Sequence, residues 1–176
     1  GIILLEGYLW DIEDGRSIAE EAMKIKLKTK AQIVLSLSDS FCVERHHQAF
    51  KDIINQGIDI VFGNEDEAMA LTETDSEEEM IKRLSSHTNI LFVITRGEKG
   101  SLIIDGINII QQKANYTNNV IDTTGAGDTY TAGFLYGLTQ EKSLQECAQL
   151  GSWAASKVIQ QVGARLDKTI TQEYEI

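Results

Sequence analysis

The stretch IDIVFGNEDEAMALT (58–72) decides the fold class, because a strand passes directly into a helix within it. The apolar run at 58–62 predicts a strand, and Gly63 and Asn64 mark its exit. The segment EDEAMALT (65–72) that follows predicts a helix. A strand followed at once by a helix is the repeating unit of α/β proteins.

The same alternation continues on both sides of this stretch. Ser76 and Glu79 predict a capping box at the start of the next helix, and a turn near Asp105 and Gly106 predicts a hairpin. Strands that alternate with helices predict an α/β fold with a mostly parallel sheet covered on both faces. The predicted strands lie at 2–5, 31–38, 58–64, 90–97 and in a hairpin at 100–112, the helices at 18–28, 41–55, 65–72, 76–87, 128–137 and 143–161, and a loop at 7–15.

Composition limits the classes of partner. The chain has 176 residues, 42% of them hydrophobic and 24% charged, which suits one domain with a real core. Its formal net charge of −11 opposes binding to nucleic acid or to an anionic membrane. No apolar run approaches the roughly 20 residues that cross a bilayer, and no signal peptide is recognised. We therefore expect a cytoplasmic protein without nucleic-acid or membrane partners.

The cysteines and two of the histidines show no metal-binding pattern in the sequence. Cys42 and Cys147 lie far apart and match neither a metal-ligand spacing nor a disulfide framework, so we expect reduced, buried thiols. His46 and His47 are adjacent, so on a helix they point in different directions and suit a shared metal poorly. A solvated helix face is the expectation for this pair.

The stretch DTTGAGDTYTAGFLYGL (122–138) places a glycine-rich turn before a helix. It lacks the lysine of a Walker A loop, and Tyr130 occupies the third glycine position of a GxGxxG fingerprint. The backbone N–H groups of Gly-Ala-Gly (125–127) and the helix dipole would form an anion hole. Asp128 beside it could accept a proton from a hydroxyl group, a combination that fits phosphoryl transfer to an alcohol. The alternative is that Asp128 only caps the helix and the glycines form a tight turn.

The whole stretch 122–138 resembles the signature of the ribokinase-type carbohydrate and nucleoside kinases, the PfkB family. Three further segments resemble motifs of this family in the family's order: GNEDEA (63–68), VITRGEKGS (93–101) and AASKVIQQVGA (154–164). Together they span nearly the whole chain. The resemblance implies a ribokinase-like three-layer α/β/α sandwich with a mostly parallel sheet.

Carried over by position, the resemblance implies a role for each matched residue. Asp128 would be the general base, and Gly125, Ala126 and Gly127 would supply the anion-hole amides. Asn64 and Glu67 would organise Mg²⁺ through water molecules, since Mg²⁺ usually keeps several of them. Asp122 and Thr124 match positions that hold a monovalent cation such as K⁺ in some members. The residues implied for the ATP site are Thr95, Gly97, Gly100 and Gly163.

The implied activity is ATP-dependent phosphorylation of a hydroxymethyl group on a sugar or nucleoside, a small-molecule acceptor that the sequence does not name. The segments LEGYLWD (5–11) and LSLSDSFCVERH (35–46) look most like adenosine-kinase-like members. Within the second, Arg45 is open between a contact to nucleotide or phosphate and a solvated helix residue. Two alternatives remain: a catalytically inactive nucleotide-binding or regulatory module, and a non-kinase α/β domain whose glycine turn is structural.

One departure from the family concerns the acceptor side of the site. The substrate-binding N-terminal half and the β-strand lid of these kinases are not recognisable, so residues 1–176 are expected to be the C-terminal, ATP-binding and catalytic part of a kinase domain. Such a part alone should turn over poorly, because acceptor positioning can be worth roughly 7–11 kcal/mol of the barrier. Lid-mediated dimers occur in this family, which leaves a homodimer of the full-length protein as an open alternative.

Overall fold

The computed structural model describes residues 1–166, which divide into two compact units. The first, here the sheet unit, comprises residues 1–95 and 102–110; the second, here the helix-pair unit, comprises residues 96–101 and the described chain from 111 onward. The last ten residues of the predicted 1–176 catalytic part lie outside the described residues.

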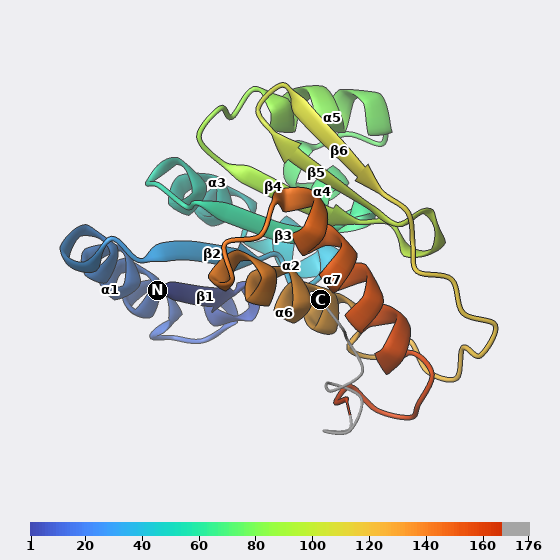
Figure 1. Cartoon of the computed structure of the whole chain (residues 1–176). Helices are drawn as coiled ribbons and strands as arrows, with labels where there is room; N and C mark the ends of the chain where they lie inside the picture. The colour runs from blue at the N-terminus through green and yellow to red at the C-terminus, as the bar shows by residue number, and fades with distance from the viewer. Residues whose placement is uncertain (167–176) are drawn as a thin grey trace. The chain divides into compact units, whose positions relative to one another are not determined.

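Six strands form one sheet in chain order, β1 to β6 (Figure 1). The first four run parallel to one another, with Ile3 opposite Ile33 and Phe62 opposite Val93, for example. The last two connections, 96–100 and 106–107, are too short for a parallel crossover of a dozen or more residues, so β5 runs antiparallel to both of its neighbours, β4 and β6. The result is a mixed sheet. The strands are β1 Ile2–Glu6, β2 Gln32–Ser36, β3 Ile60–Asn64, β4 Leu91–Thr95, β5 Ser101–Asp105 and β6 Asn108–Gln112.

One hydrophobic core joins the sheet unit's helices to one face of its strands. Alternate strand residues such as Ile33 and Leu35, or Phe92 and Ile94, point into this core because side chains alternate along a strand. The helices contribute fully buried side chains, Phe50 and Met80 among them. They are α1 Gly15–Thr29, α2 Ser40–Arg45, α3 His47–Asn55, α4 Glu65–Thr72 and α5 Glu77–Ser85.

Three features of the sheet unit differ from the sequence-based expectation. The single helix expected at 41–55 is two helices, α2 and α3, because His46 leaves helical geometry with φ −114° and ψ 20°. The loop expected at 7–15 contains a 3-10 helix, η1 Gly7–Asp11. The capping box expected at Ser76 and Glu79 is half formed, since Ser76 accepts from the Glu79 N–H and no reciprocal bond is made.

The helix-pair unit consists chiefly of α6 Ala126–Thr139 and α7 Leu144–Val158, which lie side by side (Figure 1). Their backbones touch at glycines. A methyl group on Gly133 would lie 2.8 Å from the carbonyl oxygen of Leu150, and one on Gly151 would lie 2.8 Å from that of Tyr130. A second 3-10 helix, η2 Gly97–Lys99, also belongs to this unit. Among the helices within residues 1–166, none has the length and apolar character to cross a membrane.

Candidate active site

The turn from β3 into α4 is closed by hydrogen bonds between Asn64 and Glu67. The Asn64 side chain accepts from the Glu67 N–H at 2.9 Å, and the Glu67 carboxylate accepts from the Asn64 N–H at 3.0 Å and from its side-chain amide at 2.7 Å. This is a complete capping box, and Glu67 is only 6% exposed. Both oxygens of this buried carboxylate therefore have partners within the turn itself.

Thr95 lies beside this turn at the carboxyl end of β4. The strand register places Thr95 opposite Asn64, and the Thr95 hydroxyl donates to the Gly63 carbonyl at 3.5 Å. Gly63 has no room for a side chain, since a methyl group there would lie 2.8 Å from Leu37 Cδ1 and 3.0 Å from Glu67 Oε2. The structure thus brings together three of the predicted residues: Asn64 and Thr95 at the ends of neighbouring parallel strands, and Glu67 in the first turn of α4.

The glycine turn before α6 leaves backbone donors without acceptors. Gly125 is the N-cap of α6, in the left-handed region at φ 75°. The Ala126 N–H donates to the Thr123 carbonyl at 3.2 Å, so this amide of the predicted anion hole is already used by the chain. The N–H groups of Gly127 and Asp128 have no acceptor among residues 1–166. Two adjacent unpaired donors at a helix N-terminus are the elements of an anion site.

The two glycines of this turn have different surroundings. A methyl group on Gly125 would lie 2.6 Å from Ala164 Cβ, whereas one on Gly127 would meet no other part of the described chain within 4 Å. Gly125 is therefore required by backbone conformation and packing. At Gly127 the Cβ position faces open space, next in the chain to the unpaired donors.

Asp128 is the third residue of α6 and is exposed. Its carboxylate forms no hydrogen bond or ion pair with any of residues 1–166. A capping residue at this position would accept a hydrogen bond from a backbone N–H with its carboxylate, as Glu67 and Glu146 do at the N-termini of α4 and α7. Asp128 makes no such bond, so the geometry gives it no capping function.

Asp122 ties the loop before α6 to the turn after α7. One carboxylate oxygen accepts from the Thr124 N–H at 2.9 Å and the other from the Gly163 N–H at 3.0 Å. An interaction with the Thr124 side chain, followed by these two backbone hydrogen bonds, lowers the pKa of Asp122 to about 2. Gly163 is in the left-handed region at φ 93°, and the Ile159 carbonyl accepts from the Ile121 N–H at 2.8 Å. Asp122, Thr124 and Gly163 are thus brought together within the helix-pair unit.

Gly97 and Gly100 differ in the same way as the two turn glycines. Both have positive φ, 55° and 91°. A methyl group on Gly100 would overlap the Gln112 carbonyl oxygen, at 1.9 Å, whereas one on Gly97 would meet no atom within 4 Å. Chain packing therefore accounts for Gly100, while the space at Gly97 is open.

Two buried or paired groups were missed by the sequence reasoning. The hydroxyls of Ser101 and Tyr130 are hydrogen-bonded at 2.7 Å inside the helix-pair unit, and burial raises the pKa of Tyr130 to about 12. The other is the Asp11 carboxylate, which pairs with Arg45 at 2.9 Å and with His46 at 2.7 Å. Arg45 is therefore neither free nor merely solvated. The residue separations, 29 and more, give no local signal that a sequence pattern could use.

Comparison with known proteins identifies the class. The model of the pfkB family carbohydrate kinases matches residues 2–171, so the chain belongs to this family. Over 148 residues it is 30% identical to a cytidine kinase of Thermococcus kodakarensis, covering 82% of this chain and 53% of that protein.

Solved structures agree on the fold. An adenosine kinase from Sinorhizobium meliloti is similar with a TM-score of 0.90 and 40% identity, covering 94% of this chain and 50% of that one. Arabidopsis thaliana ribokinase, solved with ribose and ATP, gives a TM-score of 0.71 and 28% identity over 93% of this chain and 51% of that one. The predicted ribokinase-like α/β fold is confirmed. The chain spans about half the length of these relatives.

Proposed function

We propose that the protein carrying this chain is an ATP-dependent phosphotransferase that phosphorylates a hydroxymethyl group of a sugar or nucleoside. The observation that carries the proposal is the N-terminus of α6. There, unpaired N–H groups at Gly127 and Asp128, open space over Gly127 and an unpartnered Asp128 carboxylate occur within two residues. Membership in the pfkB family supports the same reaction class.

Each of these groups has a distinct task in the proposed transfer. Asp128 accepts the proton of the acceptor hydroxyl as its oxygen attacks the terminal phosphorus of ATP. The N–H groups of Gly127 and Asp128, with Gly125 shaping the turn, donate to the phosphoryl oxygens on which negative charge is held. These donors are fixed by the helix before the substrate arrives, so no reorganisation is needed during the reaction.

Asn64 and Glu67 fit Mg²⁺ through water better than by direct coordination. Both Glu67 oxygens already accept hydrogen bonds from Asn64, and direct ligation would break the capping box. Mg²⁺ keeps several of its waters in such sites, so water-mediated contact preserves the turn. When bound with ATP, the ion would supply charge neutralisation at the phosphates. Thr95, Gly97, Gly100 and Gly163 complete the proposed ATP side.

A monovalent cation is a separate part of the proposal. The ionised Asp122 carboxylate, with Thr124 beside it, supplies a negative charge next to the anion-binding turn. We assign K⁺ to this place. Its test is the dependence of activity on K⁺, with Na⁺ and choline as replacements at equal ionic strength.

The acceptor class comes from the relatives and is tested directly. The complete gene product containing residues 1–176 would be screened for ADP release with cytidine, adenosine, ribose and other sugars, with ATP and Mg²⁺ supplied. Acceptor-dependent ADP release is the expected result. ATP-Mg²⁺ binding by calorimetry without turnover on any acceptor would instead support a catalytically inactive nucleotide-binding module. No nucleotide binding at all would contradict both.

A further inference from the structure

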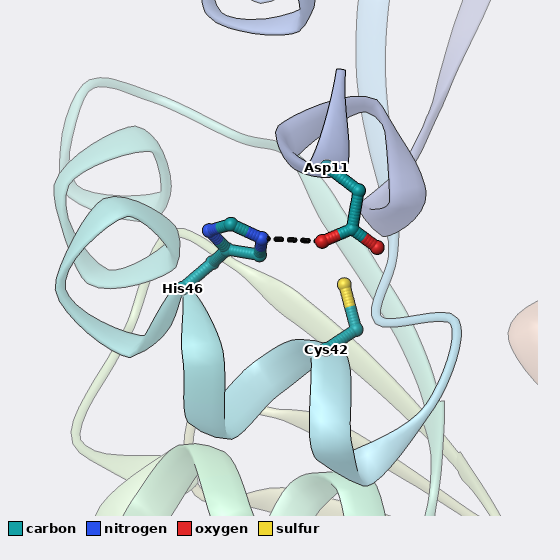
Figure 2. Close-up of side chains that lie close together, drawn as sticks. All are labelled: Asp11, Cys42 and His46. Carbon is teal, nitrogen blue, oxygen red and sulfur yellow. Dashed lines mark hydrogen bonds and ion pairs between the residues drawn. The ribbon is translucent and has the colours of Figure 1, made fainter. Parts of the chain in front are cut away.

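A second cluster of chemically active side chains lies in the sheet unit, apart from the residues proposed for catalysis. Asp11 ends η1, Cys42 lies in α2, and His46 separates α2 from α3. One ligand atom from each, a carboxylate oxygen, the thiol sulfur and an imidazole nitrogen, lie within 4.8 Å of one another. Figure 2 shows the three side chains converging on one small space.

We propose that Asp11, Cys42 and His46 form a binding site for a thiophilic divalent cation of the Zn²⁺ type. Carboxylate oxygen, imidazole nitrogen and thiolate sulfur are the three ligand types that Zn²⁺ takes in proteins, and three protein ligands leave a fourth position for water. Of the described residues, these three form the one group of His, Cys, Asp and Glu side chains with this proximity.

The distances need only a small adjustment. Ligand atoms bonded to Zn²⁺ at about 2.0–2.3 Å in a tetrahedron lie about 3.3–3.8 Å apart. The Asp11 and His46 atoms are at 2.7 Å, joined by a hydrogen bond, and would separate slightly as the ion enters between them, with the proton of the neutral imidazole carried on Nδ1 so that Nε2 binds the ion. The side chains of Asp11 and His46 are 36% and 25% exposed, so they can move and the ion can reach the site from solvent.

The surroundings hold the ligands in place. The Trp10 ring packs edge-on against Phe50 at 5.0 Å between centroids, which fixes the end of η1 next to Asp11. Asp39 caps α2 by accepting from the Cys42 N–H at 2.7 Å, and Cys42 itself is fully buried. Arg45 donates to the second Asp11 oxygen, an outer contact that orients the carboxylate and leaves the first oxygen facing His46.

Metal binding would release the proton of the Cys42 thiol. Burial, and secondarily the charges of Asp11 and Asp39, raise the pKa of Cys42 to about 11, so without metal the sulfur carries its proton. Coordination replaces that proton by the metal–sulfur bond and releases it to solvent. No oxidant or reductant is involved, because the proposed ion keeps its oxidation state.

The test uses Co²⁺ and Zn²⁺ as probes on the tag-free complete gene product containing residues 1–176, under reducing conditions. Co²⁺ should produce a thiolate-to-cobalt charge-transfer absorption in the near ultraviolet. Zn²⁺ should then displace Co²⁺ and abolish this band. Absence of this band from the folded chain would overturn the proposal. Zn²⁺ affinity would be measured by calorimetry on the same samples.

Variants assign the ligands. Cys42→Ser should abolish the band, whereas Cys147→Ser, at the other buried thiol, should keep it. His46→Gln and Asp11→Asn change exposed or half-buried groups and should fold; each should weaken Zn²⁺ binding by more than the roughly 10- to 100-fold that loss of an outer partner costs. His47→Gln is the matched control, since His47 contacts the Leu71 carbonyl instead. A band that survives Cys42→Ser, or affinity unchanged in His46→Gln, would refute the site.

Discussion

The turn that begins α4 follows a strand and the turn that begins α6 follows a loop. Both contain polar groups, yet they differ in how many of those groups lack a hydrogen-bond partner. At Asn64 and Glu67 every oxygen of a buried carboxylate has a partner inside the turn. At Gly125 to Asp128 two N–H groups and a carboxylate have none among the described residues.

This difference separates structural from functional explanations. A complete capping box stabilises its helix whether or not a ligand is bound, so the Asn64 turn by itself does not indicate chemistry. The unpaired N–H groups of the α6 turn make no hydrogen bond that stabilises the fold, and the Cβ position of Gly127 beside them faces open space. The α6 turn therefore carries the functional argument, and the following predictions probe how the two turns differ.

Replacing Asp128 should have the largest effect. Asp128→Asn in the complete gene product removes the proton acceptor while keeping size and helix position. We expect kcat to fall by roughly 10²- to 10⁴-fold, the usual contribution of a general base, with ATP-Mg²⁺ affinity retained. Steady-state kinetics and calorimetry measure the two. A kcat of Asp128→Asn equal to that of the parent enzyme would show that the unpaired carboxylate of the α6 turn is not the general base.

The pair Gly125→Ala and Gly127→Ala separates shape from ligand space within the α6 turn. Gly125→Ala should lower the free energy of unfolding by about 1–3 kcal/mol, because Gly125 has a positive φ and its new methyl group would clash with Ala164. Gly127→Ala should leave the fold intact or raise stability by about 0.5–1 kcal/mol, since alanine suits a helix better.

The effect on nucleotide affinity should have the opposite order, with the larger loss in Gly127→Ala and the smaller loss in Gly125→Ala. Gly127→Ala places a methyl group in the open space beside the unpaired donors and should weaken ATP-Mg²⁺ binding in a protein that is otherwise stable. Denaturant unfolding and calorimetry on both variants provide the comparison. Equal nucleotide affinity for Gly127→Ala and the parent chain would show that this space holds no ligand.

Glu67→Gln tests whether the closed turn also has a ligand function. The buried amide would place a donor against an Asn64 donor, costing about 1–3 kcal/mol of stability. Glu146→Gln, in the complete capping box at Ser143, is the matched control and should cost less because it is exposed. Only Glu67→Gln should reduce Mg²⁺-dependent nucleotide binding. The same reduction in both variants would point to helix stability as the cause.

The smallest expected effect is an acid sensitivity near the α6 turn. Hydrogen bonds from Thr124 and Gly163 hold the pKa of Asp122 at about 2, below its ordinary value near 3.8. The carboxylate's stabilisation is therefore complete above about pH 4 and is lost as pH falls toward 2. Thermal unfolding of the chain and of Asp122→Ala across this range should converge at the acid end. A gap between them that stays constant with pH would contradict this assignment.

Local patterns predicted much of the fold because their causes are local. Apolar runs and helix caps placed all six strands and the helices after 58, and the glycine turn was placed correctly before α6. The break at His46 was not predictable, since residues 41–55 keep helical spacing through it. Nor was the Asp11 pairing with Arg45 and His46, which joins residues more than 30 positions apart.

The candidate site divides along the same line. The motif residues could be selected from the sequence, but equivalent-looking glycines could not be ranked. Gly100 is fixed by the Gln112 backbone and Gly125 by Ala164, while Gly97 and Gly127 border open space. The space at each glycine depends on which distant segment packs against its Cα, and the spacing of residues along the chain gives no information on that packing.

The glycine contacts between α6 and α7 have a mechanical consequence. Gly133 lies directly against the backbone of α7, and Gly151 lies against the carbonyl and the ring of Tyr130, so the two helices are in close contact there. The pair should therefore move as a single rod, carrying the donors at one end and the hydrogen-bonded turn at 159–163 with it. Substitutions along this contact should then be tolerated least at Gly133 and Gly151, where the two helices lie closest together, although neither residue is proposed to take part in the reaction.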